Sequence, residues 1–325
     1  MAQPATLTSP SFAPHNGYLL AGFGSLLFAM KGILIKIAYG TGNAIAVDAI
    51  TLLAIRMCFA MPVYVVIGAL SWRERVRDGC PMPTGRLALF TALVGLLGYY
   101  LSSYLDFQGL VYLTAQFERL ILYTYPVFVM ILGALFFGGR LTRLGVLALV
   151  VSYSGIATIF LDGGSGQGDH VALGAALVLG SAFTFALYQL VAKSLITQVG
   201  SRMFTCIAMT SASIGVLTHF FAWHGVSALF ALPGPIVLIG ALIAIFATVL
   251  PSFMLNAALE RISAEAVSMI GTISPAATIV MAIVVLGEPF TLTDAFGTVL
   301  VIAGVGLFTW HDGRRRASAA ALAAA

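Results

Sequence analysis

The sequence predicts an all-α, polytopic membrane protein with ten transmembrane helices, arranged as two inverted five-helix repeats around a central cavity. Three observations predict this fold class. Hydrophobic residues make up 60% of the 325-residue chain and charged residues only 9%, whereas a soluble domain is roughly 45–50% apolar and about 25% charged. The chain contains ten apolar runs of membrane-spanning length, and its second half repeats landmarks of the first.

Each apolar run has about 20 residues, enough for a helix to cross the hydrocarbon core. Helices are expected because lipid offers no hydrogen-bond partners to an open backbone, and an outer-membrane barrel would show short alternating segments. The first run is expected to be retained rather than cleaved as a signal peptide, since no Lys or Arg precedes it. The expected spans cover residues 17–39, 46–70, 86–108, 114–137, 142–161, 171–193, 201–223, 233–256, 264–287 and 294–311.

Lys and Arg occupy alternate connections between the spans, and this asymmetry predicts the orientation. They follow the even-numbered spans and recur in the C-terminal tail, while the connections after odd-numbered spans contain neither. Both termini are therefore expected in the cytoplasm. The basic tail is interpreted as a topology signal, with binding of anionic lipid as the alternative. The basic residues are Arg73, Arg75, Arg77, Arg86, Arg140, Arg143, Lys193, Arg202, Arg261, Arg314, Arg315 and Arg316.

An internal repeat is visible when the chain is compared with itself. An offset of 149 residues pairs Pro126 with Pro275 and Gly155 with Gly304, and proline and glycine mark backbone geometry. Each unit holds five spans, so the second unit enters the membrane upside down. Inverted repeats are typical of transporters with a midplane substrate site. The expected segments are a tail (1–16), the first repeat (17–161), a periplasmic linker (162–170), the second repeat (171–311) and a basic tail (312–325).

Several of these residues also carry a family resemblance. The chain resembles EamA-type members of the drug/metabolite transporter superfamily, and among them the bacterial amino acid exporters of the YddG type. The resemblance covers about residues 17–311 and implies ten helices, a central cavity, alternating access and a bacterial inner-membrane location. It rests on Arg56 in span two, the helices of Pro126 and Pro275, and the two endings 138–142 (GGRLT) and 287–291 (GEPFT).

The two endings differ at one informative position. Glu288 stands in the second ending, whereas Gly139 occupies the matching place in the first, which departs from the Gly-Glu pattern of the family. A symmetric role for this glutamate in both repeats is therefore in doubt.

Ionisable side chains inside a span are costly unless they face a cavity or a partner. Lys31 is expected either to hold a substrate carboxylate or to form an internal ion pair with Glu118 or Asp106. Arg56 is expected to bridge helices. A gate or ion-pair network is expected from Arg56, Asp106, Glu118 and Arg119, with simple interfacial placement as the alternative for Glu118 and Arg119. Asp106 is expected near an outer helix end. No acid is expected near the midplane, which argues against a proton relay there.

Polar and aromatic residues form two further stripes. Tyr99, Ser103 and Asp106 share one face of span three, and Arg119, Tyr123 and Pro126 share one face of span four. Both stripes are expected to face one wet cavity, the alternative being contacts between helices. The other expected substrate-binding residues are Tyr188 and Gln189 on span six, Ser252 and Asn256 on span eight, and Thr272 on span nine.

Three residues are expected to give the helices flexibility. Pro126 and Pro275 lie at the centres of spans four and nine and are predicted to bend them as hinges, a static kink being the alternative. Gly98 is predicted to let span three flex or approach a neighbour.

The sequence contains no nucleotide-binding, metal-binding or other cofactor motif, and the glycine-rich segment 163–168 is expected to be a linker. We therefore expect a monomeric or homodimeric exporter or facilitator of small metabolites, with amino acids first, no cofactor and no nucleic-acid partner. The alternatives are a multidrug or other metabolite exporter on the same fold, an intramembrane enzyme, and a membrane sensor.

Overall fold

The computed structural model describes residues 14–40, 47–79, 81–136, 143–161, 170–261, 270–271, 273–304 and 306–307. Within these ranges the secondary structure is helical, with no strand. The α-helices are α1 (Pro14–Gly40), α2 (Ala49–Arg77), α3 (Gly85–Gly95), α4 (Ser102–Tyr112), α5 (Ala115–Leu122), α6 (Tyr125–Phe136), α7 (Arg143–Leu161), α8 (Val171–Val199), α9 (Ser201–His224), α10 (Ser227–Phe230), α11 (Gly234–Ala244), α12 (Leu250–Arg261) and α14 (Ile273–Met281).

Seven helical segments in the described ranges are long and apolar enough to cross a membrane. Three shorter apolar helices, Val150–Leu161, Ser274–Leu286 and Leu292–Gly304, accompany them. The prediction of an all-helical membrane protein is confirmed at this level. The seven longer segments are Asn16–Gly40, Ala49–Arg77, Gly85–Tyr112, Ala115–Phe136, Val171–Val199, Ser201–His224 and Gly234–Ala258.

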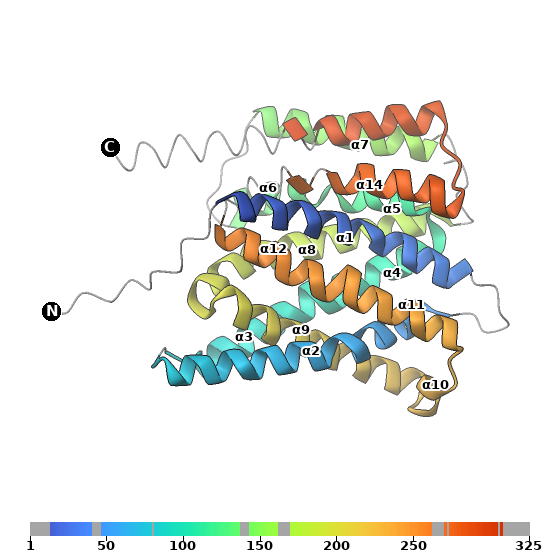
Figure 1. The fold of residues 1–325 in the computed structure, drawn as a ribbon. Coiled ribbons are helices and arrows are strands. Elements are labelled where there is room, and N and C mark those ends of the chain that lie inside the picture. Colours follow the sequence, from blue (N-terminus) through green and yellow to red (C-terminus); the bar gives the residue numbers. More distant parts are fainter. Residues whose placement is uncertain are drawn as a thin grey trace, which may run out of the picture.

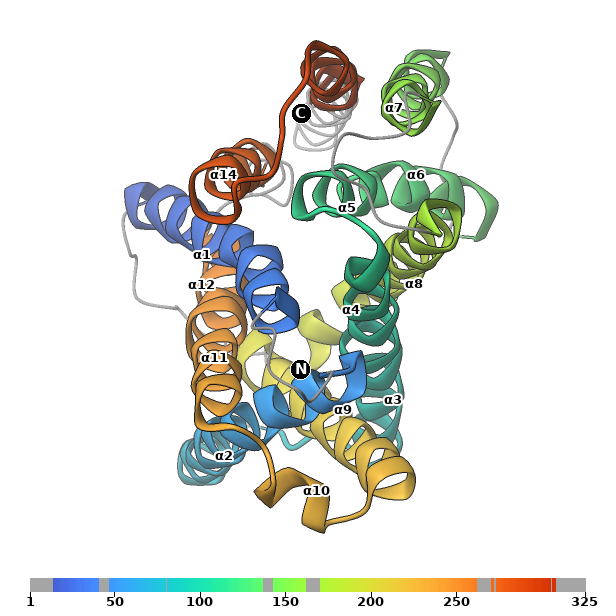
Figure 2. The same cartoon turned by 90° about the vertical axis from the view of Figure 1, so that its right-hand side faces the viewer.

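Helices from the two halves of the chain pack against one another. Helix α2 packs on α9, α1 on α12, and α4 on α8. Viewed end-on, α1, α12 and α11 line one side of the molecule, and α4, α3 and α8 face them from the other side (Figure 2). The long helices run roughly side by side, with α7 at the edge of the bundle (Figure 1). The core is therefore built jointly by both halves.

Short polar side chains begin several helices. Asp48 accepts a hydrogen bond from Thr51 N and caps α2, and Thr114 does the same for α5 through Phe117 N. Such residues satisfy backbone N–H groups that have no partner in the first turn. The short connection at Thr114 therefore separates α4 from α5 without leaving buried donors unpaired.

Two π-helical turns interrupt the long helices at matching positions. They cover Leu96–Leu101 and Ile245–Val249, and their starts are separated by the offset that aligns the two halves. One turn links α3 to α4 and the other links α11 to α12. π-Turns often occur at functional sites, and their matching placement supports the internal repeat.

Both prolines of interest lie close to the first described residue of the helix that contains them. Helix α5 ends at Leu122, and Pro126 is the second residue of α6. Pro275 is the third residue of α14. Proline is tolerated in a first turn because the missing N–H has no helical partner there. The sequence predicts a bend at Pro126, and the structure interrupts the helical segment just before it, at residues 123–124 between α5 and α6.

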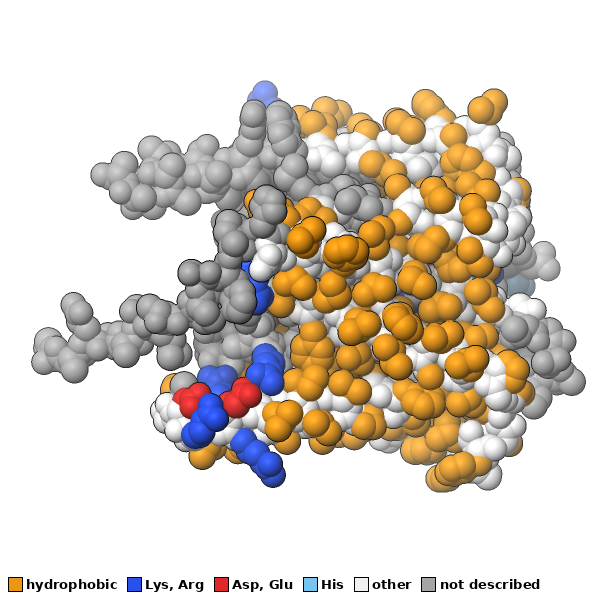
Figure 3. All heavy atoms as spheres, viewed as in Figure 1, with side chains coloured by type: hydrophobic (Ala, Val, Ile, Leu, Met, Phe, Trp, Pro, Cys, Tyr) orange, Lys and Arg blue, Asp and Glu red, His pale blue; other side chains and the backbone are white. Residues whose placement is uncertain are grey.

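The charged side chains gather at one end of the molecule. Figure 3 shows Lys, Arg, Asp and Glu clustered at the end where α2 finishes, next to a wide apolar belt. Arg202 Nη1 lies 2.8 Å from Glu74 Oε2 at this end. At the opposite end, His224 Nε2 lies 2.9 Å from Asp48 Oδ2. An apolar belt bounded by polar ends is what a bilayer requires.

Candidate functional site

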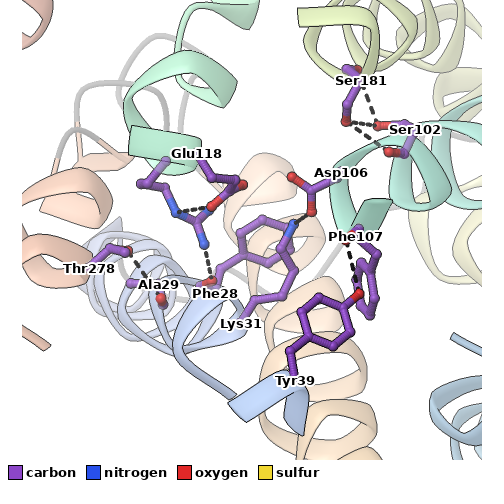
Figure 4. Close-up of polar contacts among 11 residues, drawn as sticks. Phe28, Ala29, Lys31, Tyr39, Ser102, Asp106, Phe107, Glu118, Ser181 and Thr278 are labelled. Atoms are coloured by element: carbon purple, nitrogen blue, oxygen red, sulfur yellow. Dashed lines mark hydrogen bonds and ion pairs between the residues drawn. The ribbon is translucent and has the colours of Figure 1, made fainter. Parts of the chain in front are cut away.

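A buried ion pair joins α1 to α4. Lys31 Nζ lies 2.5 Å from Asp106 Oδ2, and the two side chains are 7% and 1% exposed. The ammonium also lies 5.2 Å from the centre of the Phe28 ring. Figure 4 shows Lys31 reaching from α1 toward Asp106. Of the two alternatives for Lys31, this structure therefore contains the internal ion pair.

Glu118 and Arg119 on α5 extend this pair into a cluster of four charged side chains. Glu118 is fully buried, and Arg119 Nε lies 4.0 Å from its Oε2 atom. Arg119 Nη2 donates to the carbonyl oxygen of Phe28 at 3.2 Å. Electrostatic interactions connect Glu118 with Arg119, Lys31 and Asp106. The expected ion-pair network is thus assembled from three helices, α1, α4 and α5.

The structure shows what surrounds Asp106. Its side chain is buried against Lys31, while its position in α4 (Ser102–Tyr112) agrees with the expected place toward one end of the helical segment Gly85–Tyr112. The expectation that no acid lies near the midplane stays a prediction, because burial between helices does not fix a depth in the bilayer. Counting residues along a span gives an approximate depth, but it does not show which neighbours surround a side chain.

Arg56 lies apart from the four-residue cluster. Its guanidinium is stacked 5.0 Å from the centre of the Phe107 ring, and the residue is 4% exposed. Among the described residues, its Nε atom has no hydrogen-bond partner. Arg56 links α2 to α4 through a cation–π contact, which fits the bridging role expected from the sequence.

An aromatic series runs along one side of the site. The Tyr188 hydroxyl donates to the Tyr99 hydroxyl at 2.8 Å, and Phe185 stacks on Tyr188 with ring centres 5.5 Å apart. Tyr125 contacts Phe185 at 5.3 Å, and Tyr123 contacts Tyr125 at 6.0 Å. The sequence singled out Tyr99, Tyr123 and Tyr188 but missed Phe185, whose spacing of three residues from Tyr188 on one helix was the available signal.

Gly98 allows the close approach of Tyr188. A Cβ atom at position 98 would lie 2.2 Å from Tyr188 Cγ, so no larger residue fits without displacement of the ring. Gly98 belongs to the π-helical turn Leu96–Leu101. Its observed contact is the close helix approach that was one of its two expected roles.

Other predicted residues make contacts between helices. Ser252 Oγ lies 2.9 Å from the Tyr64 hydroxyl, and Asn256 Nδ2 donates to Thr205 Oγ1 at 2.5 Å. These are the interhelical contacts that the sequence left open as the alternative to substrate binding. Gln189 hydrogen-bonds the side chain of Tyr125, within the aromatic series.

Ser103 is partly buried, while the adjacent Ser102 links α4 to α8 by hydrogen bonds with Ser181. The contact at Ser102 was not anticipated, because a serine within an apolar span carries no signal of its partner. Thr272 lies outside the described residues.

Glu288 makes a contact that the sequence did not foresee. Its Oε1 atom accepts from Ala115 N at 2.8 Å and its Oε2 atom from Gln116 N at 3.2 Å, so it caps the start of α5 from the other half of the chain. Beside it, Lys36 Nζ donates to Leu113 O at 3.0 Å. Helix α5, which carries Glu118 and Arg119, is thereby held at its first turn.

Comparison with known proteins agrees with this architecture. A family model described as the EamA-like transporter family matches residues 15–161 and 172–310. The uncharacterized transporter YcbK of Bacillus subtilis is 28% identical over 86% of this chain and 88% of its own. A probable terminal-alkyne amino-acid exporter of Streptantibioticus cattleyicolor is 28% identical over 73% of this chain and 79% of its own.

The fold also matches a known crystal structure. The alignment covers 93% of this chain and 99% of that one, with a TM-score of 0.59 and 17% sequence identity. At this identity the likeness concerns the fold alone.

Proposed function

This chain belongs to the EamA-like transporter family, and on that premise we propose that it exports small metabolites, or facilitates their diffusion, across a bacterial inner membrane. Amino acids, including aromatic ones, are the substrates that the site supports best. The transport mechanism would be alternating access, in which the two halves rock about a midplane site.

The proposed architecture has ten transmembrane helices in two inverted repeats. The seven long apolar segments and the three shorter apolar helices support this number. The inverted arrangement is supported by the matching π-turns and by the odd number of expected spans in each half. The charged end shown in Figure 3 would face the cytoplasm, with both termini on that side.

One observation carries the choice of substrate: the buried Lys31–Asp106 pair and the aromatic series lie on segments that pack together. The ion pair joins α1 to α4, and α4 packs against α8, which carries Tyr188 and also packs against α6 and the π-helical turn that holds Tyr99. An amino acid presents a carboxylate, an ammonium group and a side chain. Its carboxylate would replace Asp106 on Lys31, and its ammonium would take the place of Lys31 on Asp106. The aromatic series would contact an apolar side chain.

The ion pair lowers the cost of this exchange, because both buried charges keep a partner when the substrate binds. A lone buried charge would be expensive, whereas a paired one is tolerated. The amino-acid exporter among the relatives supports the same substrate class.

A second candidate is export of cationic drugs or other metabolites on the same fold. Asp106 and Glu118 favour it, because they give the buried cluster as many acids as its two bases, Lys31 and Arg119.

Flux measurements in proteoliposomes distinguish the two candidates. Labelled phenylalanine, methionine and threonine would be compared with an organic cation, without an ion gradient and with protein-free liposomes as the control. Saturable amino acid flux that unlabelled amino acid competes away is the expected result. Cation flux without amino acid flux would overturn the amino acid proposal in favour of the second candidate.

A further inference from the structure

The carboxyl groups of Asp106 and Glu118 approach one another inside the bundle. Their side chains lie within hydrogen-bonding range, on α4 and α5. Asp106 Oδ1 and both carboxyl oxygens of Glu118 are buried and have no donor among the described residues. Figure 4 shows the two carboxyl groups turned toward the same point near Lys31.

A direct hydrogen bond between these two carboxyl groups requires a proton. An ionised carboxylate only accepts hydrogen bonds, so two of them can bond to each other only when one is protonated. Two negative charges in contact in a buried site also repel each other strongly, and one shared proton removes that repulsion. The O–H of one carboxyl group then donates to the other carboxylate.

The surrounding charges favour a proton over a metal ion. Lys31 on α1 and Arg119 on α5 both face this acid pair, and a divalent metal cation would add twice the positive charge that a proton adds beside them. Helix α14, which also packs against α5, contains no charged side chain, and α7 and α8 contribute none to the groups that act on Glu118 in the described part of the chain. No group of three metal-ligating side chains is found among the described residues.

We propose that Asp106 and Glu118 form a proton-binding site, and that uptake and release of this proton couple substrate movement to the transmembrane proton gradient. The inference rests on the proposed transport function. It assigns the proton as the coupling ion, whereas the sequence argued against a proton relay at the midplane.

Helix α5 provides a route for the coupling. It is a separate segment, Ala115–Leu122, whose first turn is capped by Glu288 and whose end precedes the break before α6. Movement of α5 relative to α4 would separate Glu118 from Asp106 and free the proton. Arg119, already 4.0 Å from Glu118 Oε2 on the same helix, would then compensate the ionised carboxylate.

The first test measures labelled amino acid accumulation in proteoliposomes with and without an imposed pH gradient. For one proton moved per substrate, one pH unit supports at most about tenfold accumulation. We expect the wild-type protein to concentrate substrate only when the gradient is present. Equal flux with and without the gradient would overturn the coupling, and so would a response to sodium in place of protons.

The variant Glu118→Gln tests whether release of the proton is needed for coupling. The amide N–H of Gln can donate to Asp106 as the protonated acid would, but it cannot be released, so the ratio of gradient-driven to undriven flux should fall to unity. Glu74→Gln is the matched control, because Glu74 is an exposed acid at the charged end of the molecule; it should keep the wild-type ratio. A normal ratio in Glu118→Gln would contradict the proposal.

Infrared spectroscopy tests the site without any substrate. The protein in lipid should show the carbonyl band of a protonated carboxyl group at neutral pH. This band should disappear in Glu118→Gln or Asp106→Asn and remain in Glu74→Gln. Absence of the band in the wild type would refute the shared proton even if amino acid flux is found. Conversely, the band together with an absence of amino acid flux would uphold the proton site and reject the proposed substrate.

Discussion

Glu288 and Ala115 are joined across the two halves of the chain, since the glutamate carboxylate accepts the backbone N–H of Ala115 at 2.8 Å. The same carboxylate accepts from the next N–H, at Gln116. In the first half Gly139 occupies the matching position and has no carboxylate to offer. We call this contact of the Glu288 carboxylate with the N–H groups of Ala115 and Gln116 the Glu288 latch. We expect it at only one end of the molecule, opposite the charged end.

Removal of the latch should loosen α5. Glu288→Ala leaves two backbone donors at the start of α5 without their acceptor and should cost about 1 kcal/mol, the usual value of a helix cap. Thermal unfolding of the protein in detergent gives this cost. A cysteine introduced at Gln116 should also react faster with a thiol reagent applied from the outer side.

Glu288→Gln is the graded control, because its carbonyl oxygen can still accept one of the two N–H groups. It should fall between the wild type and Glu288→Ala in both measurements. Equal reactivity of the introduced cysteine in all three proteins would show that the latch does not hold this end closed.

Lys31 and Asp106 should prove interdependent in stability. Lys31→Ala leaves a buried carboxylate without its partner, and breaking a buried pair in this way costs about 3–5 kcal/mol. The double variant Lys31→Met with Asp106→Leu replaces both charges by apolar groups and should recover most of that loss. Thermal unfolding of the wild type, Lys31→Met, Asp106→Leu and the double variant measures the coupling. Additive losses would argue against the ion pair.

Lys31 should also influence substrate choice. If a substrate carboxylate exchanges with Asp106 on Lys31, Lys31→Ala should weaken transport of amino acids far more than transport of analogues that lack the carboxylate. The ratio of the two fluxes corrects for the amount of folded protein. An equal loss for both substrates would leave Lys31 with the ion-pair role alone.

Gly98→Ala should displace Tyr188 and disturb the aromatic series. The added methyl group would lie 2.2 Å from the Tyr188 ring, and overpacking of this kind typically costs about 1–3 kcal/mol. Gly22→Ala is the matched control, because the nearest atom to its added Cβ is 4.0 Å away. Thermal unfolding should separate the two variants, and similar unfolding temperatures would contradict the packing role of Gly98.

Pro126→Ala should join α5 and α6 into a more continuous helix. Alanine restores a backbone N–H group and has a high helix propensity. A continuous helix through residues 123–124 should therefore become more stable relative to the interrupted one. If the break lets α5 move, turnover should fall while substrate binding is retained. Binding by calorimetry and flux in proteoliposomes separate these two effects. Unchanged turnover would favour a static break that only shapes the site.

The helical segments and their polar ends were predictable from the sequence because they depend on local chemistry. Apolar runs of bilayer length, Lys and Arg in alternate connections, and caps such as Thr114 need no knowledge of distant residues. The offset pairing Pro126 with Pro275 likewise revealed the repeat. The sequence predicts a bend at Pro126 but not an interruption at residues 123–124, because a proline allows either a kink or a helix start, and the neighbouring turns decide between them.

The site was predictable in composition but not in connectivity. The sequence identified Lys31, Asp106, Glu118 and Arg119 as unusual, since each places charge within an apolar span. It left the partner of Lys31 open, because depth along one helix says nothing about which neighbour faces a residue. The contact of Glu288 with α5 was missed for the same reason.

The sequence by itself determined the class of protein, because burial of a 60% apolar chain with few charges is a matter of composition and run length. Only the tertiary structure decided how the few charges are satisfied. Lys31 meets Asp106, and Asp106 meets Glu118, because α1, α4 and α5 pack at one place. Pairwise electrostatics in an apolar interior depend on distances of a few ångströms, and those distances are set by helix packing rather than by spacing along the chain.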